Sequence, residues 1–172
     1  MLEAGEDRLY IIRRMLRMAS EDIGMAEPNA LRLVLSVKDA FAVLGIPEGD
    51  LALFQAAVYL ACAPKSNALY RCEIKTRALI DRTGTPPVPL ALRNAPTKLM
   101  VELGYAQGYI YAHDDPLGAL DLAYLPAGLE NETLYDPREA GFEKKIKEIM
   151  DARTKAKRAR AGSHRPAAGK KS

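Results

Sequence analysis

Apolar residues recur at helical spacing through the first two thirds of the chain, and Gly and Pro separate the segments. The spacing predicts a helix over residues 7–20, because its apolar positions fall on one face and its arginines on the other. The apolar positions are Ile11, Ile12, Met15, Leu16 and Ala19, opposite Arg13, Arg14 and Arg17.

A second helix is predicted from Pro28, which suits a first turn, to Leu44, where Gly45 suits the stop. Its predicted stripe, with Lys38 as the one polar interruption, is Leu31, Val34, Leu35, Lys38, Phe41 and Leu44. A third helix is predicted between Pro47 and Pro64, with a small-residue face that permits close helix approach. That face contains Leu53, Ala56, Ala57, Leu60 and Ala61.

Ser66 is predicted to cap a fourth helix that runs to about Arg82, with Gly84 closing it. GTPPVPL, residues 84–90, holds three prolines and predicts an extended connector. Asn94 is then expected to cap a short helix from Ala95 to Leu103 that ends at Gly104. Residues 105–135 lack a sustained period, so we expect a long ordered loop that its tyrosines and leucines hold across the helices, with a few residues of strand at most.

A last helix is predicted from the DPREAGFEKK stretch, with Asp136 as cap, Pro137 in the first turn and Glu139 completing a capping box. Its predicted stripe is Phe142, Ile146, Ile149 and Met150. The stripe ends before Arg153, so residues 152–172 are expected to be a basic tail, helical at first and then disordered. The pattern predicts an all-α fold: a multi-helix bundle over residues 1–151 with a long Tyr/Pro-rich ordered loop.

The net charge of +3 conceals two opposite regions. Eight of the 25 Lys and Arg follow Asp151 and none of the 22 acids does, so the first 151 residues hold 17 bases and carry a net charge of −5. The tail is therefore the strongest electrostatic candidate for DNA contact, through Arg153, Lys155, Lys157, Arg158 and Arg160.

Neither a membrane-length apolar run nor a secretory signal is present. Two cysteines, Cys62 and Cys72, are too few for a disulfide framework, and we expect buried thiols in a reducing cytoplasm.

The sequence contains no phosphate-binding, dinucleotide-binding, hydrolase or zinc-protease motif. His113-Asp114-Asp115 is interpreted as a turn, because adjacent residues do not easily ligate one ion. The tyrosines near it could stack on bases, but residues 105–111 contain no Lys or Arg, so packed rings are favoured. APKSNALY, residues 63–70, lacks the glycines of a phosphate loop and is interpreted as a break between two helices.

Four stretches resemble the region after the ATPase module of the RarA/MgsA family, the bacterial relatives of the Werner-helicase-interacting protein. They are MLEAGEDRLYIIRRMLRMASEDIGMAEPNAL, LALFQAAVYLACAPKSNALY, VPLALRNAPTKLMVELGYAQGYIYAHD and YLPAGLENETLYDPREAGFEKKIKE. The order and spacing of APKSN, LRNAPTKLM and the GY-x-x-GY-x-Y block match the family over roughly residues 1–150. Arg8, where the family commonly has proline, Leu122-Ala123 and the tail depart from it.

The resemblance implies a clamp-loader-collar-like oligomerisation domain of an AAA+ ATPase that acts in DNA replication, recombination and repair at stalled forks. It implies a homotetramer, DNA and replication-fork proteins as partners of the full-length protein, no membrane, and a cytoplasmic, nucleoid-associated location. It also implies that this chain has no cofactor and no enzymatic activity alone, and that ATP and Mg bind in an N-terminal module that the chain lacks. Met1 matches an interior family position, and the opening MLEAGED offers no evident helix cap, as expected of an excised domain.

Residues 92–116 are interpreted as a folding and assembly device, whose motif residues are Arg93, Asn94, Pro96, Lys98, Tyr105, Tyr109 and Tyr111. The alternative is a nucleic-acid-binding module that uses the basic tail together with Arg13, Arg14 and Arg17. An independent enzyme is a third hypothesis, against which the missing motifs argue.

Overall fold

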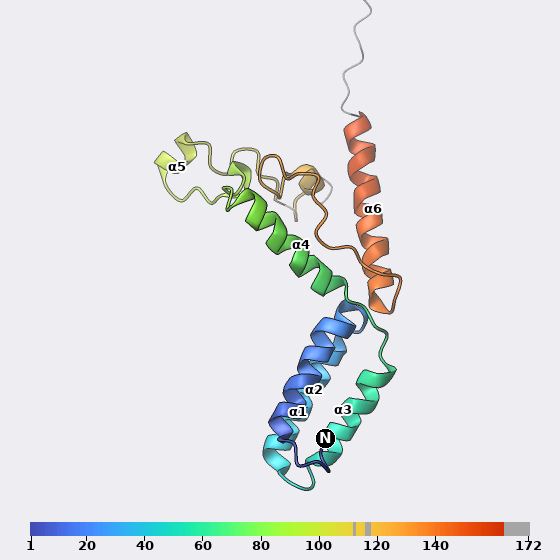
Figure 1. Ribbon diagram of the computed structural model, residues 1–172. Coiled ribbons are helices and arrows are strands. Elements are labelled where there is room, and N and C mark those ends of the chain that lie inside the picture. The colour runs from blue at the N-terminus through green and yellow to red at the C-terminus, as the bar shows by residue number, and fades with distance from the viewer. Residues whose placement is uncertain (112, 116–117, 164–172) are drawn as a thin grey trace, which may run out of the picture. The chain divides into compact units, whose positions relative to one another are not determined.

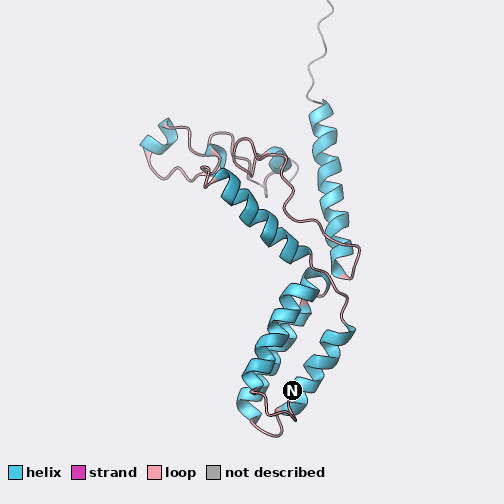
Figure 2. Cartoon of the chain, in the orientation of Figure 1, coloured by secondary structure: helices cyan, strands magenta, loops and turns pink. Residues whose placement is uncertain are grey.

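The computed structural model describes residues 1–111, 113–115 and 118–163, and in these residues it is helical without any strand (Figure 2). The all-α prediction is therefore confirmed. The helices are α1 (Arg8–Met18), α2 (Asn29–Leu44), α3 (Asp50–Cys62), α4 (Ala68–Thr83), α5 (Lys98–Glu102) and α6 (Phe142–Ser163). A π-helical turn, Ala19–Ile23, follows α1, and 3-10 turns occupy Gly24–Ala26, Leu90–Leu92 and Gly118–Asp121. Within the described ranges no helix is both long and apolar enough to cross a membrane.

The chain divides into two compact units. The first unit joins Met1–Ala78 to Leu134–Lys147, and the second joins Leu79–Thr133 to Glu148–Ser172. The boundaries fall inside α4 and α6, so each of these helices contributes residues to both units.

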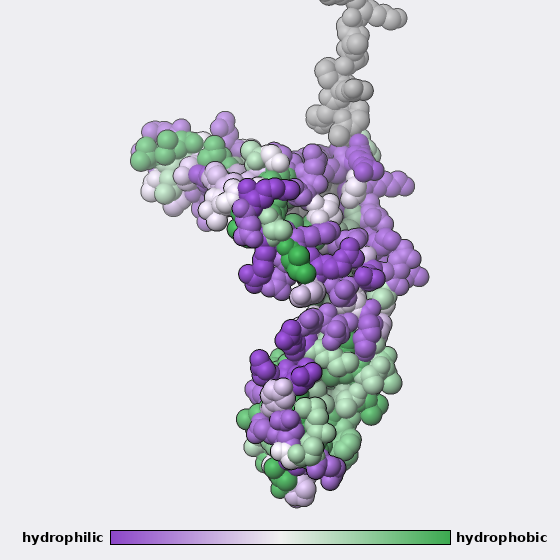
Figure 3. All heavy atoms as spheres, viewed as in Figure 1, coloured by the Kyte–Doolittle hydropathy of each residue, from purple (hydrophilic) through white to green (hydrophobic). Residues whose placement is uncertain are grey.

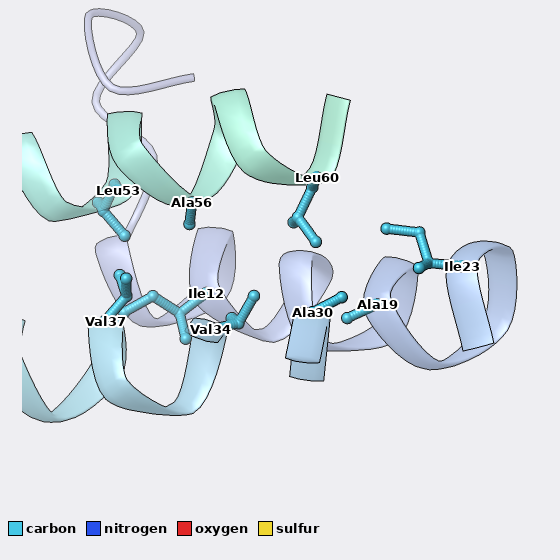
Figure 4. Close-up of a cluster of buried hydrophobic side chains, with 9 residues drawn as sticks. All are labelled: Ile12, Ala19, Ile23, Ala30, Val34, Val37, Leu53, Ala56 and Leu60. Carbon is cyan, nitrogen blue, oxygen red and sulfur yellow. The ribbon is translucent and has the colours of Figure 1, made fainter. Parts of the chain in front are cut away.

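The first unit is built on α1, α2 and α3, which pack against one another (Figure 1). Ile12 of α1, Val34 of α2 and Leu53 and Leu60 of α3 are almost fully buried, and their side chains meet in one cluster (Figure 4). Burial of each such side chain stabilises the fold by about 1.5 to 3 kcal/mol. The predicted stripe of α1 is confirmed, since Ile11, Ile12 and Ala19 are buried and Met15 and Leu16 are half-buried.

The start of α1 is capped, contrary to the expectation from the opening residues. Asp7 has extended backbone geometry, and its carboxylate accepts a hydrogen bond of 2.8 Å from the backbone N–H of Tyr10. This satisfies one of the amide groups that the first turn leaves without an intrahelical partner. The side chain of Arg8 then donates to Asp50 at the start of α3, at 3.0 and 3.2 Å.

Helix α2 buries only part of the predicted stripe, since Val34 is in the core and Phe41 packs against it. Ala30, Val34 and Val37 are buried, whereas Leu31 and Leu35 are 40% and 42% exposed. Two neighbouring lines of this helix are apolar, and the smaller side chains face α1 and α3, where helix axes approach closely. Lys38 and Leu44 belong to the predicted stripe as well, but both are exposed and lie outside the core. The predicted stop is confirmed by Gly45 at the C-cap with a φ of 67°.

The predicted ends of α4 are confirmed, and so is the end of α5 at Gly104, whereas the start of α5 is corrected. Ser66 Oγ accepts from the backbone N–H of Ala68 at 3.2 Å, and Gly84 N–H donates to the carbonyl of Ile80 at 2.7 Å. Residues 84–89 are irregular, as the prolines predict. The cap of α5 is Thr97, whose hydroxyl accepts from Met100 N–H at 3.3 Å, and not Asn94. Pro96 disfavours helical geometry at the residue before it, so α5 begins later than predicted.

The second unit contains the long connection between α5 and α6. Its described part, residues 105–111, 113–115 and 118–133, contains no strand, where a few residues of strand at most were expected. Ala119 and Leu122 are buried, and the hydroxyl of Tyr124 donates to the carbonyl of Ala119 at 2.9 Å. Local contacts of this kind, and not an α-helix or a strand, stabilise the described part of this segment.

The predicted start of α6 at Asp136 is wrong, because the helix begins at Phe142. Glu139 does not close a capping box; its carboxylate accepts from Lys147 at 2.5 Å. Glu143, not Phe142, is the buried residue of the first turn, while Phe142 and Ile149 are each 43% exposed. Helix α6 continues to Ser163, and the disorder predicted for the end of the tail lies outside the described residues.

Candidate assembly surface

The outer face of α3 is apolar and exposed. We define this α3 outer face by Leu51, Phe54 and Val58, which are 75%, 59% and 65% exposed. Their spacing, three and then four residues, places them on one line of the helix, as in the seam between two packed helices. Apolar side chains gather on the surface where Figure 1 places α3 (Figure 3).

The inner and outer lines together make α3 apolar around most of its circumference, with Gln55 as the exception in its middle. Leu53, Ala56 and Leu60 are buried against α1 and α2, so the predicted small-residue face is confirmed at these positions. Ala57 and Ala61, predicted to share that face, are exposed. A helix that is apolar all round is typical of one buried on every side, although the described chain covers only one side of α3.

Charge is nearly absent from α3. Asp50 is its one residue that is charged at neutral pH, and that carboxylate is already paired with Arg8 at 3.0 Å. The paired Asp50 raises the pKa of the Arg8 guanidinium by accepting its hydrogen bond. A partner of α3 would therefore be recognised by shape and apolar contact, not by charge.

An apolar cavity of about 350 Å³ adjoins the α3 outer face. Phe54 and Ala57 line it together with Ile11 and Met15 of α1 and the apolar start of the chain at Leu2. The cavity can accept a large apolar side chain, because its lining is mainly carbon.

A second feature of the first unit is the completely buried carboxylate of Glu143. Its Oε2 accepts from the hydroxyl of Ser66 at 2.6 Å and from the backbone N–H of Arg138 at 2.8 Å. Its Oε1 accepts from the hydroxyl of Tyr135 at 2.7 Å. Burial raises the pKa of Tyr135, and the hydrogen bond to Glu143 raises it further, so the phenol stays protonated and remains a donor. We call this set of four residues the Glu143 network.

The Glu143 network explains two of the motifs by their place in the fold. APKSN joins α3 to α4, and YDPREAG leads into α6, so Glu143 ties the two connections together. Arg138 also donates to the side chain of Asn67 at 3.0 Å, and Lys65 donates to carbonyls at the end of α3, including Ala63 at 3.0 Å. Lys65 thus caps a helix C-terminus. This supports the interpretation of APKSN as a break between helices.

The buried side-chain groups of the Glu143 network all have hydrogen-bond partners. Among the described residues, no buried side-chain nitrogen or oxygen is without a hydrogen-bond partner. The arrangement resembles a structural polar core, in which every group is satisfied and the geometry is fixed. Sequence reasoning found Ser66 as a cap but missed Glu143, because a Glu in a Lys-rich helix start is usually solvated.

The predicted assembly motif in residues 92–111 is only partly packed. Arg93 donates to the carbonyl of Val88 at 2.7 Å and to the hydroxyl of Tyr105 at 3.2 Å, and its guanidinium lies 5.1 Å from the ring centre of Tyr105. Tyr109 and Tyr111 are 51% and 53% exposed. The prediction that their rings pack on the helices of the same chain is therefore wrong. The other motif residues, Asn94, Pro96 and Lys98, are exposed.

The His-Asp-Asp stretch forms a turn, as predicted. The backbone N–H groups of Asp114 and Asp115 both donate to the carbonyl of Tyr111 at 3.0 Å. The ring of His113 lies 5.0 Å from that of Tyr111. Across the described ranges, no group of three His, Cys, Asp or Glu side chains could hold a metal ion. The cysteine prediction is corrected, since Cys62 is exposed and Cys72 is half-buried.

The candidate DNA-contact residues all lie on α6. Arg153, Lys155, Lys157 and Arg158 are exposed, and Arg160 donates to Asp121 at 2.8 Å. The other arginine group, on α1, is surrounded by charge of both signs. Arg17 donates to Glu21 at 2.6 Å, and the cavity of about 560 Å³ beside Arg13 and Arg14 is also lined by Glu21 and Asp22.

The fold and its surfaces define the chain as an all-α helical domain. Comparison with known proteins then places it. The family model described as "MgsA AAA+ ATPase C terminal" matches residues 1–154. The chain belongs to this family of MgsA AAA+ ATPase C-terminal domains.

Named relatives support the assignment. Replication-associated recombination protein A of Coxiella burnetii is 49% identical over 152 residues, which are 88% of this chain and 34% of that protein. The protein of the same name in Escherichia coli K12 is 46% identical over 152 residues, 87% of this chain and 34% of that protein. ATPase WRNIP1 of Dictyostelium discoideum is 45% identical over 137 residues, which are 79% of this chain and 16% of that protein. The chain spans about a third of the length of these bacterial relatives.

Proposed function

We propose that this chain is the self-assembly domain of a clamp-loader-related AAA+ ATPase and that it joins four copies of its parent into a homotetramer. The observation that carries the proposal is the α3 outer face: Leu51, Phe54 and Val58 are exposed on one line of a helix whose only charge is already paired. Contiguous apolar surface of this kind marks an interaction site.

A second copy of the chain is the occupant that best fits this face. An isologous two-fold contact brings the same patch together from both subunits, so the patch must complement itself. An uncharged apolar helix meets that condition, because it brings no like charges together. The cavity beside Phe54 offers each subunit a place for an apolar side chain of its partner.

The α3 outer face can supply only the centre of the contact. A helix of α3's 13 residues is about 20 Å long, whereas a stable interface buries about 800 Å² on each partner. A tetramer also needs more contact than one two-fold pair. Further exposed apolar side chains lie in α5 and in the residues that follow it. Those more than half exposed are Leu99, Val101, Leu103 and Tyr109.

We infer the role of the parent protein from its relatives. The family description and the relatives' names support an ATPase that acts in replication-associated recombination. In this proposal the parent binds ATP and Mg in an N-terminal module, works on DNA with replication-fork proteins in the cytoplasm at the nucleoid, and has its catalytic residues outside this chain.

Sedimentation analysis of this chain tests the proposal. One chain has a mass of 18.9 kDa, and at micromolar concentration we expect a species of four times that mass, which dissociates through dimers on dilution. A species of 18.9 kDa that persists up to the highest soluble concentration would refute self-assembly.

A further inference from the structure

The second half of α6 is a basic helix that continues beyond the part of the chain matched by the family. The family model ends at residue 154, whereas α6 continues without a break to Ser163. From Ala152 to Ser163 the helix contains five bases and no acid. The tail was predicted to be helical at first, and α6 confirms this as far as Ser163.

We propose that this extension of α6 is a nucleic-acid-binding element that contacts the phosphate backbone of a DNA duplex. We call it the α6 extension, residues 155–163. The proposal does not rest on the assembly proposed above, because it concerns a different surface and a different ligand.

The direction of the bases along α6 supports the proposal. Phe142, Ile146 and Ile149 follow one line of the helix, and Arg153 and Lys157 continue that line. Apolar residues therefore stop, and charge begins, at one point of a continuous helix. The line changes there from apolar side chains, of which Phe142 and Ile149 are 43% exposed, to exposed bases.

The bases surround the helix and do not form a single stripe. At 100° per residue, Lys157 lies on the side of Arg153, whereas Lys155 and Arg158 lie on the opposite side. Small alanines, Ala156 and Ala159, separate them and keep the helix narrow. The major groove of B-DNA is about 12 Å wide and admits an α-helix, so charges on both sides can reach the phosphates of both strands.

Other polyanions fit the α6 extension less well. A helix that lies on a lipid surface needs large apolar side chains on one face, and this segment has only alanine. Single strands are usually held by aromatic side chains that stack on bases, and residues 152–163 contain no aromatic residue. Without a geometry that reads bases, the contact should depend on phosphate and not on sequence.

One ion pair reduces the number of Lys and Arg side chains that are available to contact phosphate. Arg160 is engaged with Asp121 at 2.8 Å. The binding residues are therefore Lys155, Lys157 and Arg158, which are exposed, together with Arg153 at the edge of the family match.

Fluorescence anisotropy with a labelled duplex tests the proposal on the full chain. The test variant combines Lys155→Gln, Lys157→Gln and Arg158→Gln, and the control combines Arg32→Gln, Lys75→Gln and Lys145→Gln, which removes three exposed charges outside the α6 extension. At about 0.1 M salt we expect the test variant to bind at least about 10-fold more weakly, and the slope of log affinity against log salt to fall by about 2 to 3. The control should keep most of its affinity and its slope.

Four results would overturn the proposal. They are an unmodified chain that does not bind the duplex, equal affinity of the unmodified chain and the test variant, an equal loss in the control variant, and tighter binding to phosphatidylserine vesicles or to a single strand than to the duplex. A lysine-to-arginine version of the test sites, Lys155→Arg with Lys157→Arg, should bind like the unmodified chain, because it keeps the charge.

Discussion

Two motif-bearing regions of the chain have opposite environments. The first, residues 63–67 with 134–143, closes on the buried Glu143 network, in which three donors meet one carboxylate. The second, residues 92–111, holds Arg93 and Tyr105 together but leaves Tyr109 and Tyr111 about half exposed. Both regions look alike in sequence, since each combines Pro, Asn, Tyr and a basic residue.

The difference shows what each region does for the domain. A buried polar group that loses its hydrogen-bond partner costs much free energy, so the network is stable in one geometry only. The first region therefore fixes how the end of α3 and the starts of α4 and α6 meet. In the second region the contact between Arg93 and Tyr105 is local, and the rings of Tyr109 and Tyr111 are exposed on the surface. It therefore presents a surface that a partner can contact.

The sharpest test of this comparison removes the centre of the network. Glu143→Ala leaves three buried or half-buried donors without their acceptor, so we expect a loss of about 3 to 5 kcal/mol in the free energy of unfolding. The neighbouring Phe142→Ala, at a 43% exposed position, is the control and should lose less than half as much. Urea denaturation measures both, and equal losses would contradict a special role for Glu143.

The backbone beside the network gives a second test. A Cβ on Gly141 would lie 2.1 Å from the carbonyl oxygen of Ala26, and the φ of Gly141 is +50°, so Gly141→Ala should cost about 2 to 5 kcal/mol. Gly128 in the second unit also has positive φ, +85°, but open space around it. Gly128→Ala should therefore cost only about 1 to 2 kcal/mol. Thermal unfolding of the two variants should rank them in this order.

The tyrosines of the second region should differ from each other. Tyr105→Ala removes a half-buried ring and its contact with Arg93, and should cost about 1 to 2 kcal/mol. Tyr109→Ala, at a 51% exposed position, should cost less than about 1 kcal/mol in the dissociated chain. A larger loss for Tyr109 than for Tyr105 at high dilution would show that the ring packs within the chain.

The smallest expected effect is a pH dependence from Tyr135. Its pKa is raised in the folded state, so the protonated phenol contributes stability that is complete below the unfolded pKa of about 10 and is lost as pH rises through the folded pKa. The stability difference between the unmodified chain and Tyr135→Phe should therefore shrink in alkaline solution above that pH. A difference that grows there would mean that the shift has the opposite sign.

Much of the fold follows from the sequence, because most of its helix ends are set by neighbouring residues. Gly45 and Gly84 end helices as predicted, and Ser66 caps one. Part of the α2 stripe and the start of α6 were predicted wrongly, because both depend on distant residues. Two apolar lines compete on α2, and the packing of α1 and α3 selects the one with smaller side chains. Glu143, in the first turn of α6, accepts a hydrogen bond from Ser66, which is 77 residues away in sequence.

The candidate site was only partly predictable for the same reason. Residues 92–116 were expected to be the assembly motif, and that role remains a prediction. The α3 outer face was not singled out, because Leu51, Phe54 and Val58 look like core residues in sequence. Only the structure shows that Leu53 and Leu60 fill the core and leave this second line exposed.

The central claim is that chains associate through the α3 outer face, and a pair of matched valines tests it most directly. Val58→Glu places a charge on that face, whereas Val43→Glu places the same charge at an 85% exposed position of α2. Both sites are exposed, so neither variant should lose the fold. The measurement is the solution mass of each variant by sedimentation equilibrium at equal concentration. We predict that Val58→Glu lowers the mass toward 18.9 kDa while Val43→Glu leaves the assembly of the unmodified chain intact; an undiminished mass for Val58→Glu would contradict the account.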